Sequence, residues 1–219
     1  QRGARDRDGV VGEALLNRVL ACGDYAQVVA LAEAPMALGV RGLSLAKSHP
    51  FAVELQDIDF DLRAGEIVGL AGVSGNGQQE LLAALSGEDR RGKAEAINLC
   101  GTAAGRLPPG RRRRLGFGFV PEERLGRGTV TEMSLSDNVL LSLHTTLTIG
   151  YGFIRRRVLV DRAAAIIERF KVKASGPAAL ARSLSGGNLQ KYIVGREVMR
   201  KPKVLVVAQP TWGVDVGAA

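Results

Sequence analysis

Two stretches near the C-terminal end decide the fold, and they read Leu184-Ser185-Gly186-Gly187-Asn188 and Val204-Leu205-Val206-Val207-Ala208. The first is a Ser-Gly-Gly turn before an amphipathic run. It therefore predicts a helix whose N-terminal amides and positive dipole end bind an anion. The second is a five-residue apolar run after Pro202, which predicts a strand buried on both faces, as in a parallel sheet.

Length and composition indicate a soluble globular chain. Its 219 residues accommodate one sizeable core, or one core and a small subdomain. No apolar run approaches the ~18 residues that a membrane helix needs, and we expect no signal peptide. Cys22 and Cys100 have neither metal-binding nor redox spacing, so we interpret them as free thiols in a reducing compartment.

The formal net charge is +8, and the densest basic cluster is the run of four arginines at residues 111–114. Clustered cations neutralise the phosphates of nucleic acids. The alternative interpretation is a solvated loop before a strand at residues 115–120. Because aromatic residues make up 5% of the chain, stacking platforms for bases are scarce. We therefore favour the loop and expect no nucleic-acid partner.

The first half of the chain predicts strands around a glycine-rich loop. Residues 1–36 suggest one or two short helices, or a linker that arrives from an upstream domain. Strand patterns follow at residues 38–45 and 53–62, and residues 67–71 predict a buried strand. A loop comes next, Gly72-Val73-Ser74-Gly75-Asn76-Gly77-Gln78-Gln79, and then a helix at residues 79–86. A strand, a glycine loop and a helix form the context that a phosphate-binding loop requires.

The second half predicts a helical subdomain. A strand at residues 116–120 ends in Pro121-Glu122-Glu123-Arg124. The pattern from about residue 126 to 184 is mostly helical. Ser134 or Ser136 is expected to cap one helix there, and Asp161 another.

Four motifs in a fixed order resemble one known family. They are the glycine loop, Val-Pro-Glu-Glu-Arg, Leu-Ser-Gly-Gly-Asn-Leu-Gln-Lys and Ala-Gln-Pro-Thr-Trp-Gly-Val-Asp-Val-Gly-Ala. Together they resemble the ATP-binding proteins of ATP-binding cassette (ABC) transporters of the sugar and nucleoside importer type. More narrowly, the chain is similar to the degenerate C-terminal half of subunits in which two ATP-binding domains are fused.

The resemblance covers about residues 38–219 and implies a fold. That fold is an α/β P-loop NTPase, the ABC ATPase, with a RecA-like core, an N-terminal antiparallel β part and an inserted helical subdomain. We expect residues 37–219 to form this domain, truncated at its C-terminus, because the segment with the family's switch histidine is absent. Neither His49 nor His144 stands where that histidine belongs.

The resemblance also implies a weakened nucleotide site. In a working loop a Lys meets the phosphate charge and a hydroxyl binds Mg²⁺. Here Gln78 replaces the Lys and Gln79 the hydroxyl, and a lost charge-assisted hydrogen bond is worth about 1.5–3 kcal/mol. Phe51 is the candidate to stack on adenine, although a structural phenylalanine is about as plausible. The implied nucleotide-binding residues are Gly72, Ser74, Gly75, Asn76, Gly77, Gln78, Gln79 and Phe51.

The catalytic acids are missing from the strand end known in this family as Walker B. Its chemistry needs one acid for the Mg²⁺ shell and a second to polarise water. Ala208 and Gln209 stand at these positions. We therefore expect ATP as ligand but neither a catalytic residue nor a metal ligand in this chain, with Mg²⁺ held only at the partner half's site.

The motif called the signature is intact, and in ABC dimers it closes over the γ-phosphate bound by the other half. Its residues here are Leu184, Ser185, Gly186, Gly187 and Asn188. Asp215 matches the acid of the D-loop at the dimer seam, where Trp212 replaces the usual Arg. Glu122 takes the Q-loop position, and we expect it to fix that loop to the transmembrane partner.

These motifs imply the C-terminal half of the ATP-binding subunit of an ABC importer for sugars or nucleosides, with the loop motif favouring nucleosides. The implied partners are another ATP-binding half, in the same polypeptide or a dimer, and transmembrane permease subunits. A periplasmic or lipoprotein substrate-binding protein would act indirectly, and the subunit would lie peripherally on the cytoplasmic face of the membrane. Three alternatives remain: an active ATPase with unusual ligands, a non-transport ABC protein acting on nucleic acid, and a structural dimerisation module.

Overall fold

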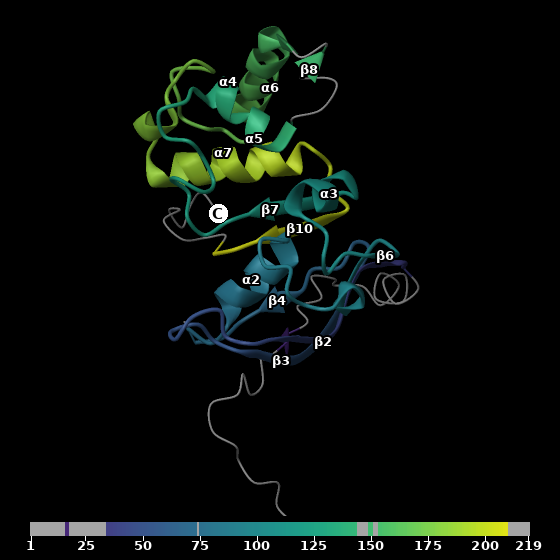
Figure 1. The fold of residues 1–219 in the computed structure, drawn as a ribbon. Coiled ribbons are helices and arrows are strands. Elements are labelled where there is room, and N and C mark those ends of the chain that lie inside the picture. The colour runs from purple at the N-terminus through teal and green to yellow at the C-terminus, as the bar shows by residue number, and fades with distance from the viewer. Residues whose placement is uncertain (1–15, 18–33, 74, 144–148, 151–152, 210–219) are drawn as a thin grey trace, which may run out of the picture. The chain divides into compact units, whose positions relative to one another are not determined.

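The computed structural model describes residues 16–17, 34–73, 75–143, 149–150 and 153–209 (Figure 1). The chain falls into two compact units, residues 1–117 and 118–219. The first unit contains the elements β1 (Leu16–Asn17), β2 (Met36–Leu45), β3 (Leu55–Arg63), β4 (Gly69–Leu70), α2 (Gln78–Ser86), η1 (Ala94–Ala96), β5 (Ile97–Leu99), β6 (Thr102–Ala103) and α3 (Pro109–Arg114).

An antiparallel sheet in the order β3-β2-β5-β6 dominates the first unit. Val40 of β2 lies opposite Phe60 on one side and Ile97 on the other, which confirms the strands expected at residues 38–45 and 53–62. Leu38, Val40 and Leu43 are buried and form the centre of this core.

The run at residues 67–71 corrects one expectation, because it is not a buried strand. Its strand part is β4, whose two residues are both exposed, and Ile67 is 65% exposed. In the described part of the chain β4 pairs only with β1, Leu16 opposite Leu70. A strand becomes buried when other strands pair with its edges and other elements cover its faces. The pairing with β1 covers only two residues of one edge, so the run stays exposed.

The arginine run is a helix rather than the expected solvated loop. Pro109 stands in the first turn of α3, where its missing N–H costs nothing. The side chain of Arg112 is 1% exposed and donates hydrogen bonds to four main-chain carbonyls, those of Ala84, Leu85, Gly105 and Leu107. A guanidinium carries five donors, so it is tolerated inside a protein where carbonyls surround it.

The second unit packs helices around the signature stretch. β7 (Phe117–Val120) enters it and pairs with β10 (Val204–Val207). The other elements are α4 (Leu135–Asn138), α5 (Leu140–Leu143), β8 (Ile149–Gly150), β9 (Phe153–Ile154), α6 (Arg156–Arg169), η2 (Ala181–Ser183) and α7 (Gly186–Val198). β8 and β9 pair in antiparallel fashion. α6 packs against both α4 and α7, and the core residues include Leu135, Leu159, Ile166, Leu189, Tyr192 and Ile193.

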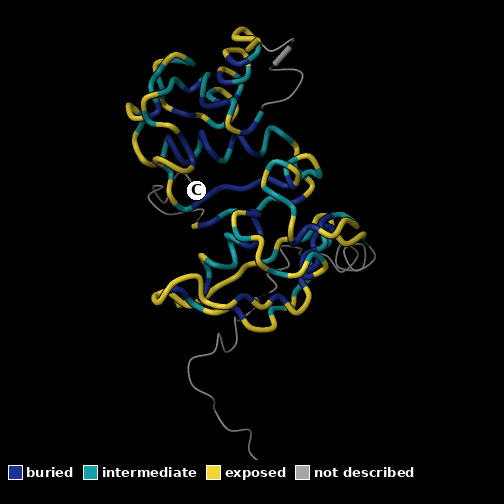
Figure 2. Tube along the Cα trace, in the orientation of Figure 1, coloured by how far each residue is buried: buried dark blue, intermediate teal, exposed yellow. Residues whose placement is uncertain are grey.

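Burial along the two paired strands differs from the expectation. β7 is buried over its whole length (Figure 2). In β10 Val204 is buried, whereas the next three residues are half-buried, so the strand is not covered on both faces as expected. Its one pairing among the described residues is with β7, which leaves its other edge without a described neighbour.

Helix capping decides between two expectations. The Ser134 hydroxyl accepts a hydrogen bond from the Asp137 amide at 3.0 Å and caps α4, as one alternative predicted. Asp161 was expected to begin a helix but lies inside α6, which starts at Arg156. The helix begins before the capping signal, and Leu159, two residues before Asp161, already packs in the core. No helix in the described ranges is long and apolar enough to cross a membrane.

Candidate functional site

The glycine loop has the backbone geometry of a strand-to-helix turn. Gly75 and Gly77 adopt φ values of 88° and 94°, left-handed conformations that favour glycine. Gly77 precedes the first residue of α2, and its carbonyl accepts from the Leu81 amide at 2.9 Å. Of the nucleotide-binding residues expected here, Ser74 lies outside the described residues.

The Gln78 side chain folds back onto this loop. Its Nε2 donates to the Val73 carbonyl at 2.8 Å, and its Oε1 accepts from the Asn76 amide at 3.0 Å. The same nitrogen lies 2.7 Å from the position that a Cβ on Gly72 would take, so a larger residue at position 72 would displace the Gln78 amide. Gln79 is exposed. Nothing in the sequence pattern signalled that the residue in the Lys position would contact its own loop.

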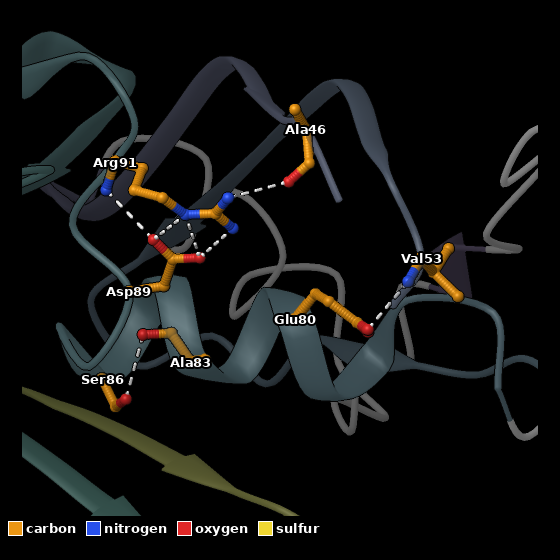
Figure 3. Close-up of polar contacts among 7 residues, drawn as sticks. All are labelled: Ala46, Val53, Glu80, Ala83, Ser86, Asp89 and Arg91. Atoms are coloured by element: carbon orange, nitrogen blue, oxygen red, sulfur yellow. Dashed lines mark hydrogen bonds and ion pairs between the residues drawn. The ribbon is translucent and has the colours of Figure 1, made fainter. Parts of the chain in front are cut away.

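The first turn of α2 is attached to the segment that carries Phe51. Glu80 accepts a hydrogen bond from the Val53 amide at 3.0 Å (Figure 3). Phe51 itself is 93% exposed, which excludes a core role for its ring. A stacking role remains a proposal.

An ion pair between Arg91 and Asp89 lies just after the C-terminal end of α2, away from the glycine loop at its N-terminal end. Arg91 binds Asp89 at 2.6 Å and donates to the Ala46 carbonyl at 3.1 Å (Figure 3). The side-chain hydrogen bond from Arg91 to the Asp89 carboxylate lowers the pKa of Asp89. An open hollow there is lined by Ser48, Ala83, Glu88, Asp89, Arg90, Arg91 and Arg106, and it includes no residue of the loop.

The signature residues stand at the N-terminus of α7. Ser185 is the extended residue before the helix, and both Ser185 and Gly186 are exposed. The Ser185 side chain does not cap the helix but accepts from Asn188 Nδ2 at 2.9 Å. Asn188 Oδ1 accepts from the Lys173 amide at 2.8 Å. Because the Lys173 main-chain N–H can only donate, the atom of Asn188 that faces it must be the oxygen Oδ1, and Nδ2 therefore faces Ser185. The Ser185 oxygen accepts this bond, so its own proton can be donated to a different group.

The segment after β7 lies beside the start of α7. A Cβ on Gly186 would come within 3.0 Å of Arg124 Nη1, so the guanidinium lies against this glycine. The Arg124 carbonyl accepts from the Thr129 hydroxyl at 2.8 Å, and Arg196 of α7 donates to the Gly128 carbonyl at 2.8 Å. The sequence carries no signal for this contact, because residues 124 and 186 are far apart in the chain. Glu122, the expected Q-loop residue, is half-buried.

The end of β10 carries no acid. Ala208 is buried and its amide donates to the Val120 carbonyl at 3.0 Å. Gln209 is exposed and has a left-handed φ of 46°. Within the described ranges no group of three or more His, Cys, Asp or Glu side chains is placed to hold a metal ion. Ala208 and Gln209 carry no carboxylate, which is the side-chain ligand that Mg²⁺ prefers, so the end of β10 does not fit this ion. Asp215 and Trp212 lie outside the described residues.

Sequence relatives agree with the motifs. The protein-family model described as ABC transporter matches residues 55–212. The guanosine import ATP-binding protein NupO of Bacillus subtilis is 38% identical over 165 residues, 75% of this chain and 32% of NupO. The nucleoside import ATP-binding protein NupA of Lactococcus lactis is 37% identical over 182 residues, 83% of this chain and 36% of NupA. The chain thus spans about a third of the length of the curated relatives it matches.

Solved structures support the fold. The ATP-binding cassette MJ0796, a dimer in a post-hydrolysis state bound to ADP and Pi, has a TM-score of 0.67 at 19% identity. The match covers 83% of this chain and 77% of that one. A nucleotide-free ATP-binding cassette from an ABC transporter has a TM-score of 0.64 at 18% identity, over 84% of this chain and 73% of that chain. The expected P-loop NTPase fold of the ABC ATPases is thereby confirmed, and the chain belongs to the ABC transporter family as an ATP-binding domain.

Proposed function

We propose that the chain is the C-terminal ATP-binding half of an ABC importer for nucleosides or sugars. It binds nucleotide weakly at its own loop and supplies its signature to the catalytic site of a partner half. The observation that carries this proposal is the exposed signature turn, whose Ser185 hydroxyl is oriented by Asn188. Relatives that are named for guanosine, nucleoside and ribose import support the substrate class.

The chain's own site lacks the charged groups of a hydrolytic centre. Gln78 brings no cation to the phosphates, and Gln79 brings no hydroxyl to Mg²⁺. Ala208 and Gln209 offer neither a metal ligand nor a base to activate water. These four substitutions affect one reaction, so we propose weak binding and no useful hydrolysis here.

The signature can bind the γ-phosphate of another half. The 13-residue helix α7 directs its positive dipole end and first-turn amides to the exposed Ser185 and Gly186. The serine hydroxyl adds a donor, because Asn188 Nδ2 donates to its oxygen and its own proton is not used in that bond. Mg²⁺ and the catalytic carboxylate would come from the partner half.

The remaining assignments follow from this role. We propose that residues 1–36 link an upstream domain to the ATP-binding domain at residues 37–219. Permease subunits would dock on the loop around Glu122 and the helical subdomain at about residues 126–184. The subunit would lie peripherally on the cytoplasmic face of the membrane, and a periplasmic or lipoprotein substrate-binding protein would reach it only through the permeases.

The test places a bulky cation in the signature. Ser185→Arg, in a complex with the partner half and permeases, is expected to lower ATP hydrolysis at least about a hundredfold, the loss typical of removing a transition-state donor. Thr102→Arg, at an exposed position of β6 outside the signature and the helical subdomain, is the matched control and should keep the rate. Retention of the full rate by Ser185→Arg would refute the donor role.

A further inference from the structure

We infer that Gln78 closes the phosphate loop on itself and thereby sets its affinity for nucleotide. The inference rests on the proposed weak site of this half, and it gives that weakness a second cause. The first cause is the missing positive charge of a lysine. The second is the contact between the Gln78 side chain and its own loop, which a phosphate must displace.

The contact uses groups that a phosphate would need. In a phosphate-binding loop the main-chain amides donate to phosphate oxygens. Here the Asn76 amide already donates to Gln78 Oε1 at 3.0 Å. At the same time Gln78 Nε2 holds the Val73 carbonyl at 2.8 Å, which fixes the side chain across the loop. The Gln78 oxygen thus takes the place of a phosphate oxygen at this amide.

Glutamine makes this closure in a way that lysine cannot. An ammonium group has three donors and no acceptor, so it can hold the Val73 carbonyl but leaves the Asn76 amide available. A carboxamide donates with its nitrogen and accepts with its oxygen, and both bonds are present in the loop. The close approach of Nε2 to Gly72, 2.7 Å from a Cβ position, shows how tightly the amide lies against the backbone.

The size of the effect follows from the two hydrogen bonds. Both are neutral and exposed to water, so together they favour the closed loop by about tenfold. Only the open fraction binds phosphate, and the apparent affinity falls by the same factor. A variant that cannot close should therefore bind about tenfold more tightly, less whatever Gln78 contributes to the bound state.

The experiment compares Gln78→Ala with Gln78→Lys in the 219-residue chain, by calorimetric titration with tripolyphosphate and with Mg²⁺-free ATP. Gln78→Ala is expected to bind both about fivefold more tightly than the wild type, and Gln78→Lys more tightly still. Gln56→Ala, at an exposed position in β3, is the control and should bind like the wild type. If Gln78→Lys gains affinity and Gln78→Ala does not, charge alone explains the weak site and the inference is overturned.

Hydrogen exchange reports on the contact without a ligand. The Asn76 amide is expected to exchange about tenfold faster in either Gln78 variant that keeps the wild-type circular dichroism. Unchanged exchange would also overturn the inference. The proposed function fails separately, if Ser185→Arg keeps the full hydrolysis rate of the complex, because that variant leaves Gln78 and its loop unchanged.

Discussion

Replacement of Arg112 by methionine should lower the free energy of unfolding by about 3 kcal/mol. The side chain is 1% exposed and donates to four carbonyls at 2.5–3.0 Å. Two of these carbonyls, of Ala84 and Leu85, lie at the C-terminal end of α2, where no intrahelical donor remains. Arg112 therefore caps the helix that begins at the phosphate loop.

Opposing contributions decide this magnitude. A buried carbonyl that loses its partner costs about 1–3 kcal/mol, and three of the four bonds are buried. Methionine, however, avoids the cost of burying a cation and retains much of the packing. Burial lowers the pKa of Arg112 to about 10, with a smaller contribution from Arg90. The guanidinium is nevertheless charged at neutral pH, so the four bonds are charge-assisted under the conditions of the assay.

The assay is urea unfolding followed by far-ultraviolet circular dichroism at pH 7. The midpoint should fall by about 1 M for a loss of about 3 kcal/mol. Arg114→Met removes the same charge from an exposed position of α3 and should change stability by less than about 0.5 kcal/mol. Equal midpoints for the two variants would refute the structural role of Arg112.

Three further predictions concern stability. Tyr192→Phe removes the buried hydroxyl that donates to a carbonyl of α4, and should cost about 1–2 kcal/mol in urea unfolding, whereas a neutral effect would contradict that bond. Gly195→Ala would place a Cβ 2.6 Å from the Phe170 ring and should cost about 1–3 kcal/mol, with recovery expected in a double variant with Phe170→Leu. The hydrogen bond from Arg91 lowers the pKa of Asp89, so its stabilisation is present above the ordinary carboxyl pKa and is lost as pH falls through the lowered value. Because Arg91 is half exposed, Asp89→Asn should cost about 0.5 kcal/mol or less at pH 7, and a cost that persists at pH 2 would exclude this cause.

Much of the fold follows from local patterns. The glycines at residues 75 and 77 allow left-handed φ angles, and the apolar spacing of the next nine residues gives α2. Alternating and continuous apolar runs likewise predicted β2 and β3, and the Ser-Gly-Gly turn predicted the start of α7. Propensity, turn chemistry and periodicity act over a few residues, so the chain order alone displays them.

The tertiary structure decided the features that depend on distant residues. Arg112 is buried because carbonyls from residues 84 and 85 meet it, and nothing near the arginine run announces them. The exposure of residues 67–71 and the partial burial of β10 likewise depend on which strands pair.

At the candidate site the sequence determined which groups are present, and the tertiary structure decided what they face. The sequence by itself shows Gln78 in place of Lys, no acids at residues 208 and 209, and an intact signature. Only the folded chain turns Gln78 onto its own loop and fixes Asn188 through the Lys173 amide. Hydrogen bonds depend on direction and distance in space, whereas a motif records only identity and spacing along the chain.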